Sequence, residues 1–535
     1  MTTAPKYLIG VDVGTGSARA GLFDQTGRLL ASAKREITLW RGPGAMVEQS
    51  SVQIWGAVAQ CVREVMAGAD PALVAGIGFD ATCSLVVLGE GGVSLPVGPS
   101  EDPARDVIVW MDHRAVDQAE RINAQGHAVL AYVGGKISPE METPKLLWLK
   151  ENRPQIFADA RHFFDLADFL TWKATGDEAR STCTVTCKWT YLAHENRWDP
   201  SYFRQIGLEE LADEQFARIG TRVVPPGTSL GQGLTAAAAA DLGLAPGTPV
   251  AAGMIDAHAG GIGTVGIEGS PLTHMAYVFG TSSCTMTSTA EPVFVPGVWG
   301  PYFSAMVPGL WLSEGGQSAA GAAIDQLLDF HPASAGARAE ARGKGQSLAL
   351  WLTQRILARA PDLSQAAALA GDLHVVPEFL GNRAPHADPH ARAVIAGLGM
   401  ERDLENLEAL YLAGICGVAY GLRQILDVQD AAGARVEKIV ISGGAGESRL
   451  IRQILADATG RVVMGSASDE PVLLGSATLG AVAGGLFPDM RPAMAGLSGP
   501  GEAHQPAGGG AKALHERRFQ AFTALQQAAR LARGA

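Results

Sequence analysis

The sequence YLIGVDVGTGSAR, residues 7–19, places an apolar run, an acidic side chain and a glycine-rich turn in immediate succession. The apolar run ends at Asp12 and is typical of a buried strand. The turn covers residues 14–17, and a second apolar run follows at residues 18–23. Two short apolar runs separated by a tight Gly/Ser turn predict a β-hairpin with glycines at its tip.

A segment of similar design returns later in the chain, at residues 274–289, with the sequence HMAYVFGTSSCTMTST. It again predicts a strand, a Gly/Thr/Ser tip and a returning strand. Two such units favour a duplicated fold whose halves face each other. The alternative is two unrelated hairpins, since Gly/Ser tips are common in β-hairpins.

The remainder of the chain alternates between helix and strand patterns, which predicts an α/β architecture. Strands are expected at residues 74–79 and 438–441, and helices at residues 51–66, 111–126, 145–151, 404–429, 449–460 and 511–533. The proline-rich segment 212–249 predicts a domain boundary near residue 258. We therefore expect an N-terminal domain over residues 1–258 and a C-terminal domain over residues 259–535.

Composition excludes several classes of protein. The chain has 66 glycines among 535 residues, against roughly 37 expected at the usual ~7%. No G-X-Y period runs through them, which excludes collagen. A hydrophobic content of 47% with 18% charged residues excludes a disordered chain.

Charge and targeting signals bear on partners and location. With 42 basic and 54 acidic residues, the chain has no basic surplus for a dedicated nucleic-acid interface. Residues 1–9 lack the apolar run of a signal peptide, and the small-apolar stretch 475–487 is too short to span a bilayer. Six dispersed cysteines suggest free thiols in a reducing compartment. We expect a soluble cytoplasmic protein with no membrane or nucleic-acid partner.

The first hairpin has the groups needed to bind a phosphate. Asp12, at a strand end, can hold Mg²⁺ directly or through water. Glycines let backbone N–H groups approach phosphate oxygens, and hydroxyl and guanidinium groups add donors. The donors proposed at this tip are Gly14, Thr15, Gly16, Ser17 and Arg19, and those of the second tip are Gly280, Thr281, Ser282 and Ser283. The alternative is an acidic turn in an ordinary hairpin.

Other glycine-rich segments are weaker nucleotide signals. No Walker-type loop occurs, and residues 261–266 match G-x-G-x-x-G without a clear preceding strand. The segment 443–446 lies between an expected strand and an expected helix. There it can accept an adenine base or ribose against the backbone, or form only a tight β–α turn.

Asp256 is the most distinctive polar residue outside the hairpins. It follows the apolar segment 249–255 and precedes small residues. A carboxylate at a strand end beside small residues can act as a general base in a cleft. The alternative is a helix N-cap. His258 is either its partner or a packed histidine.

In combination, these segments resemble the FGGY carbohydrate kinases, a family that shares its ATPase fold with actin and hexokinase. The motif D-x-G-T-x-S-x-R at residues 12–19 carries the likeness first. Further matching segments follow in the family's order: VWMDHRA at 109–115, TPKLLW at 143–148, MIDAHA at 254–259, GTSS at 280–283, EGGQS at 314–318, EFLGNRAP at 378–385 and SGGAG at 442–446. The segments FDATC at 79–83 and CTVTCK at 183–188 are similar to pentulose kinases of the ribulokinase type.

The resemblance implies two ribonuclease H-like domains with a cleft between them, and it implies roles for individual residues. Asp80, Lys188 and Glu314 would bind sugar hydroxyls, and Asp256 would be the base. Trp189 and Tyr191, beside Lys188, suggest an aromatic wall at the sugar site; the alternative for Lys188 is a surface lysine. ATP would contact Gly14, Thr15, Ser17, Arg19, Gly280, Thr281, Ser282, Gln317, Gly443, Gly444 and Ser448, with Mg²⁺ near Asp12.

The chain departs from the family's pattern at two places. The adenosine loop reads Gly-Gly-Ala, and Ser448 stands where many relatives have Asn. Residues 81–84 lack the Arg-Glu pair of glycerol kinases, which disfavours glycerol. The implied function is an ATP-dependent ketopentose kinase, with D-ribulose as substrate and a dimeric assembly. L-ribulose, xylulose or pentitol kinases and a non-catalytic nucleotide sensor are the alternatives.

Overall fold

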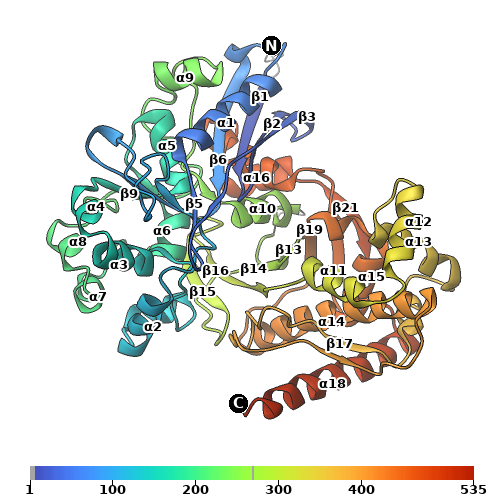
Figure 1. Cartoon of the computed structure of the whole chain (residues 1–535). Coiled ribbons are helices and arrows are strands. Elements are labelled where there is room, and N and C mark those ends of the chain that lie inside the picture. The colour runs from blue at the N-terminus through green and yellow to red at the C-terminus, as the bar shows by residue number, and fades with distance from the viewer. Residues whose placement is uncertain (1–5, 268–269, 535) are drawn as a thin grey trace.

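A computed structural model describes residues 6–267 and 270–534 of the chain (Figure 1). The first five residues of the segment 1–9, which is expected not to be a signal peptide, lie outside the described residues. The N-terminal half is built on a five-stranded sheet with the order β12-β6-β1-β2-β3. Its strands are β1 (Tyr7–Val13), β2 (Ser17–Asp24), β3 (Leu29–Glu36), β6 (Val74–Ala81) and β12 (Met254–Ile255). The expected first hairpin is therefore confirmed as β1 and β2.

The C-terminal half is built on a seven-stranded sheet with the order β15-β16-β14-β13-β19-β20-β21. The strands are β13 (His274–Phe279), β14 (Ser283–Thr289), β15 (Trp299–Phe303), β16 (Trp311–Gln317), β19 (Lys438–Ser442), β20 (Val462–Ser466) and β21 (Pro500–His504). Strands β13 and β14 are antiparallel and form the expected second hairpin.

The two sheets repeat one topology. In each, a hairpin is extended by an antiparallel third strand on one side and by parallel strands on the other: β2 to β3 and β1 to β6 in the first, β14 to β16 and β13 to β19 in the second. This shared order confirms the duplication and excludes two unrelated hairpins.

Two helices join the halves. Helix α10 (Asp256–Val265) packs against α16 (Pro471–Ala483), which also lies on β1 and β6. A Cβ on Gly475 would lie 1.9 Å from the Ala259 carbonyl oxygen, and one on Gly10 would lie 1.9 Å from the Leu473 carbonyl oxygen. Only glycine allows backbones this close, so part of the glycine excess serves this contact. Residue 258, the expected domain boundary, lies inside α10.

Most expected elements lie where the patterns predicted them. The helices are α1 (Ser51–Val65), α3 (Glu142–Asn152), α14 (Leu404–Ala431), α15 (Arg449–Thr459) and α18 (Gly509–Ala532). The helix expected at 111–126 is wrong in its first turn, because α2 spans only Val116–Gln125. The buried Asp112 carboxylate instead accepts hydrogen bonds from Val47 N and from Arg114, which fixes a turn there. The G-x-G-x-x-G segment 261–266 is helical through residue 265, within α10.

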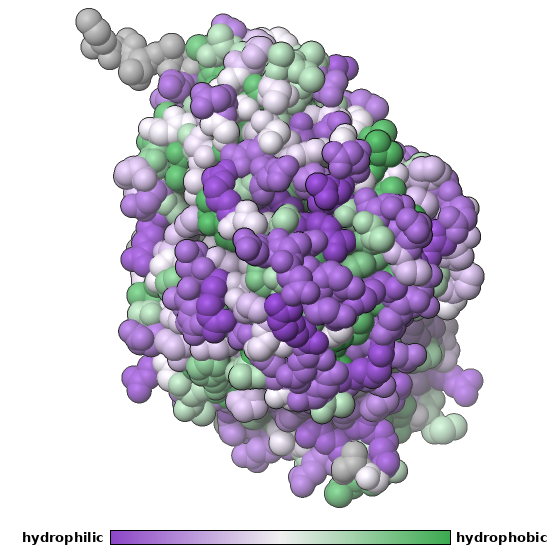
Figure 2. Space-filling view, turned by 90° about the vertical axis from the view of Figure 1, so that its left-hand side faces the viewer, coloured by the Kyte–Doolittle hydropathy of each residue, from purple (hydrophilic) through white to green (hydrophobic). Residues whose placement is uncertain are grey.

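Helix α14 is long and apolar enough to cross a bilayer, although the sequence analysis did not single it out. Its most apolar window is 83% buried inside the protein, where the helix packs against α11 (Gly321–Phe330), α15 and β17 (His374–Val376). That burial is typical of a core helix. Figure 2 shows the left-hand side of the molecule as mostly hydrophilic, with hydrophobic residues in small scattered groups.

Candidate active site

A cavity of about 730 Å³ lies between the two halves and brings together most of the residues expected at the site. The expected residues that line it are Asp12, Gly14, Thr15, Ser17, Arg19, Lys188, Asp256, Gly280, Thr281, Ser282 and Glu314. They come from both hairpins, from α6 (Thr182–Trp189), from α10 and from β16. Expected site residues as far apart in the chain as Asp12 and Glu314 therefore line one cavity.

Both hairpin tips open into this cavity. The Gly14 N–H donates to the Ser17 carbonyl at 3.0 Å, and the Gly280 N–H donates to the Ser282 carbonyl at 3.0 Å. These bonds close the turns from within. The Thr281 side chain is exposed, so its hydroxyl is free to meet a ligand from the C-terminal side. The tips thus present hydroxyl and amide donors from opposite walls, as a bound polyphosphate requires.

Arg19 is more constrained than the sequence analysis expected. Its Nε donates to Asp12 Oδ2 at 2.7 Å, and its second nitrogen donates to Glu470 Oε2 at 2.7 Å. Burial acts to lower the pKa of Arg19, but the charges of Asp12 and Glu470 outweigh it and raise the pKa. Arg19 therefore orients the Asp12 carboxylate as well as lining the cavity.

Asp256 is the first residue of α10 and its side chain is half-buried at the cavity wall. Ile255 is the N-cap, so the alternative of a capping aspartate is wrong. One carboxylate oxygen accepts a hydrogen bond from Ala257 N at 2.7 Å. Burial, followed by the negative charge of Asp12, raises the pKa of Asp256 to about 6. A carboxylate with such a pKa is a competent proton acceptor at neutral pH.

Lys188 and Glu314 form the charged centre of the opposite end of the cavity. Burial acts to raise the pKa of Glu314, but Lys188 and His258 outweigh it and lower that pKa to about 2. Lys188 is 4% exposed, so the surface-lysine alternative is wrong. Its ammonium lies 4.8 Å from the centre of the Trp299 ring. Both groups keep their charge in a half-enclosed space that can accept hydroxyl groups.

Five expected site residues do not line the cavity: Asp80, Gln317 and the three residues of the adenosine loop described below. Asp80 is fully buried and accepts a hydrogen bond from Ser476 of α16. Burial, then the charges of Asp12 and Asp256, raise its pKa. It lies next to Asp12, on the neighbouring strand, and does not line the cavity. Gln317 lies behind the second hairpin, where it accepts a hydrogen bond from Ser283 Oγ at 3.1 Å and donates to Val418 O at 3.0 Å.

The expected adenosine loop lies beside the second hairpin, outside the lining of the main cavity. Val278 pairs with Ser442 in the sheet, so the loop follows directly next to the Gly280 tip. Gly443 has φ +88°, and a Cβ there would lie 2.5 Å from the Phe279 carbonyl oxygen. Gly444 faces open space, and Ser448 caps α15 through a bond from Ile451 N. Gly443 and Gly444 are both exposed, but only Gly444 has open space in the direction of a Cβ.

The sequence as a whole matches one family of known proteins. Models of the N-terminal and C-terminal domains of the FGGY family of carbohydrate kinases match residues 7–263 and 275–484. The chain belongs to the FGGY family of carbohydrate kinases. The FGGY carbohydrate kinase domain-containing protein of Homo sapiens is 47% identical over 97% of this chain and 96% of its own length.

Two other proteins are similar to this kinase, one in sequence and one in structure. The D-ribulokinase of Saccharomyces cerevisiae is 39% identical over 89% of this chain and 72% of its own length. The crystal structure of xylulose kinase from Rhodospirillum rubrum superposes with a TM-score of 0.80, covering 98% of this chain and 99% of that one at 24% identity. This structural likeness confirms the fold of two actin-like ATPase domains. The expected ribulokinase-like FGGY kinase is likewise confirmed.

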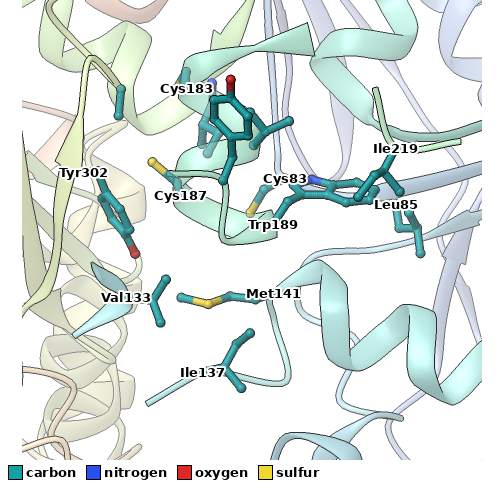
Figure 3. Close-up of a cluster of buried hydrophobic side chains, with 14 of the residues drawn as sticks. Cys83, Leu85, Val133, Ile137, Met141, Cys183, Cys187, Trp189, Ile219 and Tyr302 are labelled. Atoms are coloured by element: carbon teal, nitrogen blue, oxygen red, sulfur yellow. Dashed lines mark hydrogen bonds between the residues drawn. The ribbon is translucent and has the colours of Figure 1, made fainter. Parts of the chain in front are cut away.

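The kinase cavity also contains residues that the sequence analysis did not assign. They are Cys83, Trp110, Glu140, Cys284, Trp299, Arg383 and Glu470. Trp110 and Arg383 belong to family motifs, and this membership was the sequence signal that could have assigned them to the site. The aromatic wall expected from Trp189 and Tyr191 is wrong: both are buried in the core, and Figure 3 shows Trp189 among Cys83, Cys187 and other apolar side chains. Trp110 and Trp299 line the cavity instead.

His258 supports Glu314 from inside the protein. Its Nε2 lies 3.3 Å from Glu314 Oε2, and its Nδ1 lies 3.1 Å from Cys183 Sγ. Burial acts to lower the pKa of His258, but the Cys183 thiol and the Glu314 carboxylate outweigh it and raise the pKa to about 10. The imidazole is fully buried and does not line the cavity, so we assign it to positioning Glu314; its charge also acts to lower the pKa of Asp256.

Replacing His258 with alanine should lower the free energy of unfolding by about 2–4 kcal/mol, because it leaves a small void and removes one of the cations that stabilise the Glu314 carboxylate. We also expect the sugar KM to rise at least tenfold while the ATP KM changes little, since only Glu314 loses its support. His515→Ala is the matched control: His515 is buried and contacts Tyr420 Oη at 2.9 Å, away from the cavity. An unchanged sugar KM in His258→Ala would contradict the positioning role.

Proposed function

We propose that this kinase transfers the γ-phosphoryl group of ATP to the terminal hydroxyl of a ketopentose, with D-ribulose as substrate and D-ribulose 5-phosphate as product. The observation that carries the proposal is the position of Asp256. Its carboxylate lines the same cavity as the two hairpin tips and the Lys188–Glu314 pair. The yeast relative that carries the name D-ribulokinase favours D-ribulose among the pentuloses.

Asp256 is the proposed general base. It accepts the proton of the terminal hydroxyl as that oxygen attacks the γ-phosphorus. The new O–P bond forms while the bond to the β-phosphate bridging oxygen breaks, and ADP leaves with that electron pair. Phosphoryl transfer depends mainly on positioning and on stabilising charge, so the base adds a moderate part of the total acceleration.

We assign binding of the transferring phosphate to the two hairpin tips. Thr15 and Thr281 hydroxyls, with the tip amides, would bind the transferring phosphate oxygens. Gly444, beside the second tip, leaves room for the adenosine. The described residues contain no preformed cluster of three metal ligands. Mg²⁺ in kinases is held by one or two carboxylates with phosphate and water oxygens, so this does not argue against it.

Asp12 is the proposed carboxylate for Mg²⁺. The charges of Asp12 and Asp256 both raise the pKa of Asp80. The charge of Asp12 also acts to raise the pKa of Asp256, so this wall of the cavity has a negative potential that favours a cation, which supports the fit. When bound, Mg²⁺ would neutralise charge on the phosphate oxygens. The chain's own contribution is to orient Asp12 through Arg19.

The charges at the sugar end favour a neutral polyhydroxy substrate. Lys188 and Arg383 face Glu140 and Glu314 across this part of the cavity, so two cations are matched by two anions. Burial acts to raise the pKa of Glu140, but a hydrogen bond with His113 and the charges of Arg383 and Lys188 outweigh it and lower that pKa. Donors and acceptors that are separated but balanced suit hydroxyl groups better than a sugar acid.

A panel of substrates tests the proposal. Purified enzyme with ATP and Mg²⁺ is given D-ribulose, L-ribulose, D-xylulose, L-xylulose, ribitol, arabinitol and gluconate, and ADP release is measured by a coupled assay. We expect kcat/KM for D-ribulose to exceed that for every other compound by at least tenfold. A preference for another pentulose would correct the stereochemistry only, whereas a preference for a pentitol would replace the ketose by a polyol as the substrate. ATP turnover without dependence on any of them would favour the nucleotide-sensor alternative.

A further inference from the structure

Trp110 connects the two ends of the cavity through a single hydrogen bond. Its ring is half-buried in the cavity wall, which it shares with Lys188 and Asp256. Its indole Nε1–H donates to Thr15 Oγ1 at 2.9 Å. Thr15 is at the tip of the first hairpin, 95 residues away in the sequence. A residue beside the proposed sugar space thus holds a hydroxyl at the proposed phosphate space.

Trp110 is itself held in place. Its backbone N–H donates to Ser84 Oγ at 3.1 Å, and Ser84 Oγ also contacts Thr82 Oγ1 at 3.0 Å. On the hairpin side, Gln49 Nε2 donates to the Thr15 carbonyl oxygen at 2.6 Å. The backbone of the tip is also held by Ile37 N–H, which donates to the Gly16 carbonyl oxygen at 2.9 Å. Gln49 therefore fixes the Thr15 backbone and Trp110 fixes its side chain.

The chemistry of these two groups restricts where the Thr15 hydrogen can point. An indole N–H can only donate, so Thr15 Oγ1 is the acceptor in this bond. A hydroxyl has one hydrogen and two lone pairs. The Thr15 O–H has no acceptor among the residues that the structure describes. It remains available to donate into the cavity, in a direction set by the indole.

We infer that Trp110 is a positioning residue that links the sugar end of the cavity to the phosphate hairpin, by holding the Thr15 hydroxyl ready to donate to a phosphate oxygen. The inference rests on the proposed function, which supplies the sugar and the phosphate. A sugar packed against the indole ring restricts its motion and thereby restricts the Thr15 hydroxyl. Trp110 does not touch the reacting atoms through its N–H; it acts through Thr15.

A double-mutant cycle tests the link. The variants are Trp110→Phe, which keeps an aromatic ring and loses the donor, Thr15→Val, which loses the hydroxyl, and the double variant. We measure kcat, the sugar KM and the Kd of a non-hydrolysable ATP analogue. We expect Trp110→Phe to lower kcat about tenfold and to weaken the analogue about three- to tenfold, as for one lost hydrogen bond. The double variant should be no worse than Thr15→Val alone.

Two controls separate the link from general damage. Trp55→Phe removes an equivalent indole bond, from Trp55 Nε1 to Asp241 Oδ2 at 2.9 Å, far from the cavity lining, and should leave kcat and Kd unchanged. Thr15→Ser keeps the hydroxyl and should retain most of the activity. If Trp110→Phe does not fold, benzothienylalanine in place of Trp110 replaces the N–H by sulfur at nearly constant shape.

The inference would be overturned if the fold-changes of the two single variants multiply in the double variant, for both kcat and Kd. Such multiplication means that the two residues act independently. So would a Trp110→Phe variant that changes the sugar KM alone, since the ring would then be only a wall of the sugar site. If the wild-type enzyme phosphorylates no sugar of the panel, the proposed function fails. The Kd cycle still decides the Trp110–Thr15 link in that case: non-additive weakening supports it and multiplying weakening rejects it.

Discussion

Asp256→Asn should lower kcat for sugar phosphorylation by about three orders of magnitude, within the range usual for loss of a general base. Asparagine has nearly the same shape but cannot accept the hydroxyl proton. The sugar KM and the ATP KM should change less than about threefold. The pH profile gives a second readout: wild-type kcat should fall as the pH drops below about 6, where Asp256 becomes protonated, and the variant should lose this dependence.

Stability distinguishes this loss from misfolding. Because burial and Asp12 raise the pKa of Asp256, its ionised form is disfavoured in the folded protein. Removing that charge should leave the melting temperature unchanged or slightly higher at pH 7. Asp117→Asn is the matched control, since Asp117 is an exposed aspartate in the first turn of α2. Near-normal phosphorylation by folded Asp256→Asn would show that another group is the base.

The fold was predictable because the information for each hairpin is local. An apolar run, a Gly/Ser tip and a second apolar run determine one strand pair, and the same pattern at 274–289 revealed the duplication. The contact between α10 and α16 was not predictable in this way. It depends on glycines such as Gly10 and Gly475 meeting backbone atoms far away in sequence. A glycine count shows that there is an excess but does not say which backbone each glycine meets.

The candidate site was predictable where a motif itself forms the wall of the cavity. Thr15, Lys188 and Asp256 are such residues. The expectation that Asp80 lines the cavity was wrong. Asp80 lies on β6, an inner strand of the sheet, next to Asp12 on β1, and its side chain contacts Ser476 of α16. Neither strand position nor residue type indicates which helix covers a strand.

Arg383 illustrates the opposite error. It was quoted only as part of a family motif, yet it reaches the sugar end of the cavity, where its guanidinium carbon lies 5.7 Å from the centre of the Trp299 ring. A long side chain can cross from a loop into a distant site, and sequence spacing does not report its direction. Charge balance at the sugar end therefore became visible only from the structure.

Removing either Lys188 or Glu314 should produce a double loss, of stability and of sugar binding. Lys188→Met leaves the Glu314 carboxylate without its main cation, and Glu314→Gln leaves the Lys188 ammonium without its main anion. We expect each variant to lower the free energy of unfolding by about 2–4 kcal/mol at pH 7, because a buried charge is left uncompensated. The sugar KM should rise at least a hundredfold in both.

The double variant separates the two effects. Lys188→Met with Glu314→Gln removes both charges of the pair, so part of the stability should return, whereas sugar binding should stay lost because both hydroxyl partners are gone. Lys145→Met is the control for a buried charge: Lys145 lies 3.4 Å from Glu142, outside the cavity lining, so stability should fall with little change in sugar KM. Recovered sugar binding in the double variant would contradict the role proposed for the pair.

The pH dependence of the free energy of unfolding shows directly whether the Lys188–Glu314 interaction stabilises the folded protein. In the wild type, Glu314 has a folded pKa of about 2, below its usual 4.5, so its stabilising contribution is present above pH 4.5 and is lost as the pH falls towards 2. Without Lys188, the folded pKa of Glu314 should rise, and protonation relieves the buried charge. The stability difference between wild type and Lys188→Met, measured by denaturant unfolding, should therefore shrink between pH 7 and pH 5. A difference that stays constant over this range would mean that the two charges do not interact.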